Sequence, residues 1–235
     1  MDEKERVNTT SNWYIHGQLD FDKRLIGYRY KTWQPFLQGP EGLELGPAEG
    51  QMTRFLVNDF DRLTVVEGAL DLLNLIPSYS NLLKIHSLFE DFKPQRLYNT
   101  IILEHILEHV ESPTQLIQTA SKWLASKGRI LLGVPNGNSF HRLAAVKMGL
   151  LSHQCELNSR DLAQGHRRVY THETFRKDIE SSGLQVMEMG GVFFKPISNQ
   201  QIQDQWNEEM LNGFYELGKD FPGNAADIYA VCELP

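Results

Sequence analysis

Short, β-branched apolar segments alternate along the chain with segments of helical pattern, and this alternation constrains the fold more than any other feature. LTVVE at 63–67, YNTIIL at 98–103 and GRILLGV at 128–134 are typical of buried parallel strands. A helix is predicted at 112–125, between two of them. The pattern predicts an α/β fold: a Rossmann-like αβα sandwich with a mostly parallel seven-stranded sheet and an antiparallel C-terminal strand.

The remaining elements extend this pattern and divide the chain into parts. We expect an N-terminal helical cap at 1–40 and the main domain at 41–235, with an insertion around 138–168 where the alternation loosens. The last two strands are expected to form an antiparallel pair at the sheet edge. Further strands are predicted at 42–45, 82–88, 184–189 and 227–234, and further helices at 20–36, 50–59, 69–75, 172–182 and 200–217.

Composition and charge narrow the class of partner. The 235 residues are 41% hydrophobic and 23% charged, as in ordinary globular proteins, and the net charge of −7 disfavours a nucleic-acid partner. The N-terminal MDEKERVNTTS has no apolar core of a secretory signal, and no apolar segment is long enough for a membrane span. Cys155 and Cys232 show no metal-ligand spacing. We expect a cytoplasmic protein with reduced thiols and without a membrane partner; a homodimer is left open.

A glycine-rich turn, ELGPAEG at 44–50, follows the first predicted strand and opens the next helix. Backbone N–H groups and the positive end of a helix dipole meet at such a point. The small residues Gly46, Ala48 and Gly50 let a ligand approach the backbone closely. The spacing G-x-A-x-G differs from the G-x-G-x-x-G of dinucleotide-binding turns, which disfavours a nicotinamide-dependent oxidoreductase. Alone, the turn indicates a backbone site for a polar ligand or ordinary turn chemistry.

A carboxylate in a second position strengthens the binding interpretation. Glu67 ends the next predicted strand, about 20 residues after the turn. An acid there can accept hydrogen bonds from both ribose hydroxyls of an adenosine, although a solvated acid at a strand end is the plainer alternative. The turn and Glu67 together favour a nucleoside-containing ligand.

These segments together resemble class I S-adenosylmethionine-dependent methyltransferases of the methyltransferase domain types 11 and 23. The resemblance covers residues 43–136 and extends to GHRRVYT at 165–171. Two positions depart from the family pattern, with Ala48 in place of Gly and Asn99 in place of Asp. The matching segments are ELGPAEG at 44–50, VVEG at 65–68, FED at 89–91, YNTIIL at 98–103, LEHVESP at 107–113 and KGRILLGVPN at 127–136.

The resemblance implies S-adenosylmethionine as the cofactor and assigns residues to it. The turn would contact the methionine part through its backbone, and Glu67 would bind the ribose. His109, from the family's Leu-Glu-His segment, would either make a structural hydrogen bond or face the active site. The cofactor-binding residues implied are Glu44, Gly46, Pro47, Ala48, Gly50, Glu67, Gly68, Leu88 and Phe89 beside the adenine, and Leu103 and Glu104 beside the methionine end.

Methyl transfer to a hydroxyl or amine also needs a group that takes a proton, and histidine is the natural base near neutral pH. His105, His141 and His166 are the candidates, since they follow predicted strands or lie in the insertion. Each is otherwise a surface or packing histidine. The insertion is locally basic, with Arg142, Arg167 and Arg168, which favours either an anionic acceptor or a solvated basic face; Asn136 and His153 are further polar candidates.

Other signatures narrow the type of methyltransferase without naming the acceptor. No metal-ligand spacing is present, which argues against the metal-dependent catechol type. The fourth strand is not followed by the Asn/Asp-Pro-Pro-aromatic segment of enzymes that methylate adenine in DNA. The leading hypothesis is methylation of a small molecule, at oxygen. The alternatives are a methyltransferase acting on protein or RNA and a cofactor-binding module without turnover.

Overall fold

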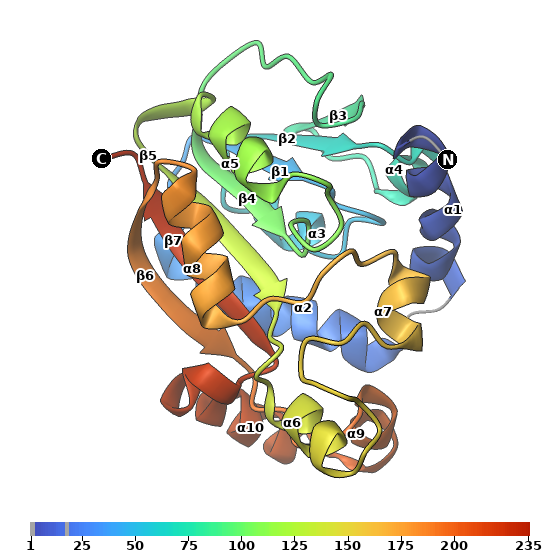
Figure 1. The fold of residues 1–235 in the computed structure, drawn as a ribbon. Helices are drawn as coiled ribbons and strands as arrows, with labels where there is room; N and C mark the ends of the chain where they lie inside the picture. The colour runs from blue at the N-terminus through green and yellow to red at the C-terminus, as the bar shows by residue number, and fades with distance from the viewer. Residues whose placement is uncertain (1–2, 17–18) are drawn as a thin grey trace.

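A seven-stranded sheet lies between two layers of helices in the computed structural model, which describes residues 3–16 and 19–235 (Figure 1). The strand order is β3-β2-β1-β4-β5-β7-β6, and only β7 runs antiparallel to its neighbours. The strands are β1 (Glu41–Leu45), β2 (Arg62–Glu67), β3 (Leu82–His86), β4 (Tyr98–Glu104), β5 (Leu124–Pro135), β6 (Gln185–Val192) and β7 (Asp227–Glu233). The predicted mostly parallel sheet with an antiparallel C-terminal strand is confirmed. β7 lies inside the sheet, and β6 forms the edge.

The helices differ from the sequence prediction mainly in their ends and number. The helix predicted at 200–217 is two helices, because the side chain of Asn207 caps the second by accepting a hydrogen bond from the backbone N–H of Met210 at 2.9 Å. The helix predicted at 112–125 ends at residue 121. The helices are α1 (Glu3–His16), α2 (Asp20–Trp33), α3 (Thr53–Leu56), α4 (Leu70–Leu75), α5 (Pro113–Ser121), α6 (Phe140–Lys147), α7 (Ser159–Gln164), α8 (His172–Ser181), α9 (Asn199–Gln205) and α10 (Glu208–Asp220), with 3₁₀ turns η1 (Gln34–Phe36) and η2 (Pro222–Asn224).

Each face of the sheet has its own apolar core, because successive side chains of a strand point to opposite faces. Leu103 packs on one face with residues of α5 and α8, whereas its neighbour Ile102 packs on the other face with residues of α2, α3 and α10. Trp33 from α2 is among the largest fully buried side chains of the second core. Helix α2 is therefore part of the main body of the fold.

Charged side chains hold helix α1 against the loop after β4 and the segment after α7. Arg6 donates hydrogen bonds to the carbonyl oxygens of His109, at 2.9 Å, and of Gly165. Glu3 forms an ion pair with Arg167 at 2.6 Å. These contacts place α1 beside α4 and α7 (Figure 1).

The carboxyl edge of the sheet collects polar side chains from distant parts of the chain. The turn follows β1, and Glu67 and Glu104 end β2 and β4. Because β7 is antiparallel, its first residue, Asp227, pairs with Pro135 at the end of β5 and lies at the same edge. This edge is where open α/β sheets bind ligands.

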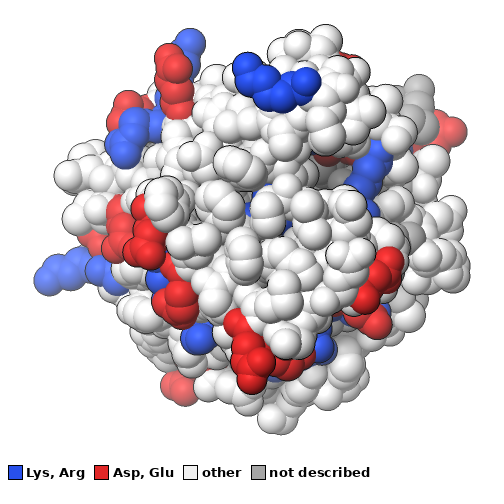
Figure 2. All heavy atoms as spheres, turned by 90° about the horizontal axis from the view of Figure 1, so that it is seen from below, with Lys and Arg blue, Asp and Glu red and all other residues white. Residues whose placement is uncertain are grey.

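The surface is mixed in charge. On the face seen in Figure 2, basic and acidic side chains are interspersed around a largely uncharged centre. None of the helices in the described part of the chain is long and apolar enough to cross a bilayer.

Candidate functional site

A cavity of about 300 Å³ lies at the carboxyl edge of the sheet and reaches from the glycine-rich turn to Asp227. Helices α1, α2 and α7 contribute to its walls through residues such as Tyr14, Arg29 and Asp161. Residues from the N-terminal helices and from β7, near the end of the chain, therefore line the same cavity.

The backbone of the turn is held in a conformation that favours glycine. Gly46, Ala48 and Gly50 have φ angles of 65°, 48° and 85°. A Cβ atom at Gly46 would overlap the side chain of Ile106, so only glycine fits there without a shift of its neighbour. Ala48 adopts positive φ despite its methyl group, which residues other than glycine do at a cost.

Glu67 connects the end of β2 to this turn. Its carboxylate accepts hydrogen bonds from the backbone N–H groups of Ala48, at 3.1 Å, and Ala69, at 2.8 Å. Burial raises the pKa of Glu67 to about 7, although these N–H groups oppose the shift. The carboxyl oxygens line the cavity and keep further acceptor capacity for ligand hydroxyls.

A second acid lies beneath the turn. Glu44 is buried and accepts a hydrogen bond from the hydroxyl of Thr53 at 2.6 Å. Burial, together with the neighbouring Glu67, raises the pKa of Glu44 to about 8. Two acids with raised pKa values thus lie at one end of the cavity.

Most of the residues expected near the cofactor line the cavity. They are Glu44, Gly46, Pro47, Ala48, Glu67, Gly68, Leu88, Phe89 and Glu104. Two expectations differ from the structure. Leu103 is fully buried in the apolar core on one face of the sheet, and Gly50 packs against Ile76.

The other end of the cavity is organised around Arg29. Its Nε donates to Oδ2 of Asp227 at 2.9 Å, and its guanidinium also pairs with Glu104. Burial alone would raise the pKa of Asp227, but Arg29 and His105 hold it well below its ordinary value. Asp227 is therefore a carboxylate at neutral pH.

His105 lies between two acids. The residue has a φ of 53°, and its backbone N–H donates to the carbonyl of Gly133 at 2.9 Å. Its Nε2 is 3.4 Å from Oδ1 of Asp227, and its Nδ1 is 3.4 Å from Oε1 of Glu108. His105 lines the cavity at the point where β4 ends.

His141 and His166 also line the cavity, with different surroundings. Burial, with Lys195 and Arg142 nearby, lowers the pKa of His141 to about 2, so this imidazole is a weak base. Nδ1 of His166 is 3.3 Å from Oδ1 of Asp161.

The arginines of the insertion make structural contacts, contrary to the idea that they attract an anionic acceptor. Arg142 pairs with Asp161 at 3.1 Å and donates to the carbonyl of Gln154 at 2.8 Å. Arg167 pairs with Glu3, and Arg168 donates to the carbonyls of Leu107, Val110 and Glu111. The side chain of Asn136 likewise donates to the carbonyls of Gly223 and Ala225.

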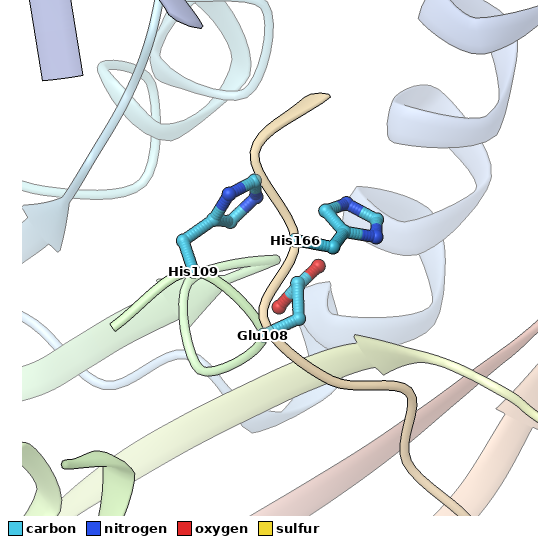
Figure 3. Close-up of side chains that lie close together, drawn as sticks. All are labelled: Glu108, His109 and His166. Carbon is cyan, nitrogen blue, oxygen red and sulfur yellow. The ribbon is translucent and has the colours of Figure 1, made fainter. Parts of the chain in front are cut away.

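Sequence reasoning missed several residues of the site. Asp227 was not chosen as a candidate, although the antiparallel strand predicted at 227–234 begins with it and so places it at the carboxyl edge. Lys195 is half-buried in the wall of the cavity, and its removal from water lowers its pKa to about 8. The fold also brings His166 close to Glu108 and His109, which are consecutive in the chain (Figure 3).

The cofactor implied by the sequence can be tested against this geometry. The turn offers the backbone of the small residues Gly46 and Ala48, Glu67 offers carboxyl oxygens, and Leu88 and Phe89 offer apolar side chains. These features fit the methionine, ribose and adenine parts of S-adenosylmethionine.

Comparisons with known proteins agree with this fit. The family model described as "methyltransferase domain" matches residues 20–189. A search of curated protein sequences gives no significant match. Among solved structures, the CcbJ methyltransferase from Streptomyces caelestis has 12% identity and a TM-score of 0.64 over 100% of this chain and 99% of that chain.

Two further structures show the same fold. A SAM-dependent methyltransferase from Archaeoglobus fulgidus has 15% identity and a TM-score of 0.62, covering 94% of this chain and 99% of that chain. The N-methyltransferase NodS from Bradyrhizobium japonicum, in complex with S-adenosyl-L-homocysteine, has 15% identity and a TM-score of 0.58, covering 98% and 95%.

Proposed function

Because the chain belongs to the methyltransferase domain family, its cofactor is S-adenosylmethionine, and we propose that it methylates a hydroxyl group of a small polar molecule. The observation that carries the proposal is that one continuous cavity has two unlike ends. The turn and Glu67 form one end, and His105, Arg29 and Asp227 form the other. One end suits the cofactor, and the other suits a polar acceptor.

S-adenosylmethionine supplies an activated methyl group on a sulfonium, so the chemistry requires mainly that acceptor and cofactor be held in line. The backbone of the turn would hold the methionine part, and Glu67 the ribose hydroxyls. Pro47, Ala48 and Gly68 also line this end.

The acceptor end supplies groups for orientation and proton transfer. Nε2 of His105 and Oδ1 of Asp227 lie 3.4 Å apart, so a hydroxyl placed beside them can donate to either. We assign His105 as the group that takes the hydroxyl proton, because it lines the cavity beside β4. His141 is a poor choice for this role, since its pKa of about 2 makes it a weak base.

The walls of the cavity favour a small acceptor over a folded macromolecule. Helix α1 contributes Arg6, Thr10 and Tyr14 to the wall, and α2 contributes Arg29. Arg6 and Glu3 hold α1 against the loop after β4 and the segment after α7. Because α1 forms part of the wall, the cavity is narrowed on this side, which supports a small acceptor over a folded protein or an RNA duplex.

The proposal is tested by measuring S-adenosylhomocysteine release from S-adenosylmethionine with fractionated small metabolites. We expect release with a fraction rich in hydroxylated molecules, lost when its hydroxyls are acetylated. Release only with amines would overturn methylation at oxygen. Labelling of protein or RNA in an extract, with all small-molecule fractions inert, would overturn the small-molecule proposal, and no release with any acceptor would favour a binding module.

A further inference from the structure

A carboxylate without a hydrogen-bond partner lies buried beside two imidazoles. Glu108 is 0% exposed, and neither of its carboxylate oxygens makes a hydrogen bond within the described residues. Nδ1 of His105 lies 3.4 Å from Oε1. A buried carboxylate with unused acceptor positions is costly unless a ligand or cation partners it.

The two imidazoles complete a set of metal ligands. One ligand atom from each of Glu108, His109 and His166 lies within 4.8 Å of the others (Figure 3). Bonds of about 2.1 Å from a central ion require ligand atoms no more than about 4.2 Å apart, so small side-chain rotations close the set. Two histidines and one carboxylate suit Zn²⁺ and related divalent transition metals, and leave coordination positions open.

His166 carries a support that is typical of metal-bound histidines. Its Nδ1 is 3.3 Å from Oδ1 of Asp161. The other oxygen of Asp161 pairs with Arg142 at 3.1 Å and accepts from the backbone N–H of Asn158 at 2.9 Å. A carboxylate on the second ring nitrogen fixes the orientation of a metal-binding imidazole and leaves Nε2 for the metal.

The surrounding charges are compatible with a cation. Arg6 and Arg167 both donate to the carbonyl of His109, but both also pair with Glu3, at 3.2 and 2.6 Å. Asp161 adds a further carboxylate on the far side of His166. Two groups compete with a metal for the His109 ring: the hydroxyl of Tyr14, which lies 3.2 Å from Nε2, and the backbone of Gly165, which also hydrogen-bonds to this side chain.

We propose that Glu108, His109 and His166 bind one divalent transition-metal ion of the zinc type at the wall of the cavity. His109 and His166 line the cavity, so the open coordination positions face it. An acceptor hydroxyl bound there would lose its proton more readily, as metal-bound water does. This role rests on the proposed function, whereas metal binding itself does not.

The test is calorimetric titration of Zn²⁺ into chelator-treated full-length protein without acceptor, repeated with Co²⁺ followed by visible absorption. We expect one equivalent bound, with at least tenfold weaker binding in His166→Gln and in Glu108→Gln. His153→Gln, at an exposed histidine, is the matched control and should bind within twofold of the parent. Tyr14→Phe removes the competing hydroxyl and should bind at least as tightly.

Three results would overturn the inference. The parent could bind less than about 0.2 equivalents of metal, His166→Gln and Glu108→Gln could bind the metal as tightly as the parent does, or the Co²⁺ complex could show the absorption bands of a thiolate ligand. Thermal unfolding in the presence of chelator shows which variants fold. One folded variant, either His166→Gln or Glu108→Gln, is enough for the comparison of metal affinity with the parent. S-adenosylmethionine titrated into the metal-free protein separates the two proposals. If the protein binds S-adenosylmethionine but no metal, the metal site is contradicted and the proposed function is not.

Discussion

The two ends of the cavity are built in different ways. The cofactor end comes from two neighbouring strands and the turns after them: the backbone N–H of Gly46 donates to the carbonyl of Val66, and that of Ala48 donates to the carboxylate of Glu67. The acceptor end is assembled from α2, the loop after β4 and the start of β7, which bring Arg29, His105 and Asp227 together. One end is thus a local motif, and the other exists only in the folded chain.

The two ends of the cavity also shift the pKa values of their carboxyl groups in opposite directions. Burial raises the pKa of Glu44 to about 8 and of Glu67 to about 7. Asp227 is equally buried, yet Arg29 and His105 hold its pKa below the ordinary value. The comparison predicts that changes at the cofactor end alter cofactor affinity, and that changes at the acceptor end alter turnover.

The largest effect is expected at the acceptor end. His105→Asn keeps a residue type that tolerates positive φ but cannot take a proton from the acceptor. We expect turnover to fall by about 10²- to 10⁴-fold, while affinity for S-adenosylmethionine stays within about threefold. Rate measurements and calorimetry on the same preparation check both parts, and turnover close to that of the parent would remove His105 from this role.

A smaller effect is expected from the turn at the cofactor end. Gly46→Ala adds a Cβ that meets Ile106 at a φ of 65°. Gly149→Ala is the matched control, since Gly149 has a φ of 72° but nothing within 4 Å of the added atom. We expect cofactor affinity to fall by about tenfold or more in Gly46→Ala and to stay unchanged in Gly149→Ala. Equal losses in both would mean that the backbone cost alone, and not the close packing of the turn, is responsible.

A third effect is expected in the pH dependence of stability. The pKa of Glu44 is about 8 in the folded state against 4.5 ordinarily, so the folded state holds a proton that the unfolded state loses. The contribution of Glu44 is therefore fully present below pH 4.5 and is lost as pH rises to about 8, by up to about 1.4 kcal/mol per pH unit.

Glu44→Gln removes this titration and keeps an acceptor for Thr53. The unfolding free energy is measured with urea from pH 5 to 8. As pH rises, the value for the parent should fall steadily relative to that for the variant. A difference independent of pH would contradict the raised pKa of Glu44, because the other titrating groups are common to both proteins.

The sequence predicted the parts of the molecule that local patterns determine. Buried strands such as 63–67 are recognised from their apolar residues. The helix predicted at 172–182 is α8, and Thr171 caps it by accepting a hydrogen bond from the backbone N–H of Thr174. Helix α1 was not predicted as a helix of its own, because its residues are mostly polar and its position depends on Arg6 and Glu3.

The acceptor end lay outside the reach of local patterns. Asp227 reaches the carboxyl edge only because β7 is antiparallel, and Arg29 lies there because α2 packs across the sheet. The arginines of the insertion suggested an anionic acceptor, but their carboxylate and carbonyl partners appear only in the folded chain. Long-range pairing decides which charges are available to a ligand.

The most direct test of the account is calorimetric titration of S-adenosylmethionine into the parent and Glu67→Ala, with Asp61→Ala, at the opposite end of β2, as control. We predict one micromolar-range site in the parent, unchanged in Asp61→Ala and at least tenfold weaker in Glu67→Ala. Equal affinity in Glu67→Ala, or no heat with S-adenosylmethionine while NAD binds, would contradict the assignment of this end of the cavity to the cofactor.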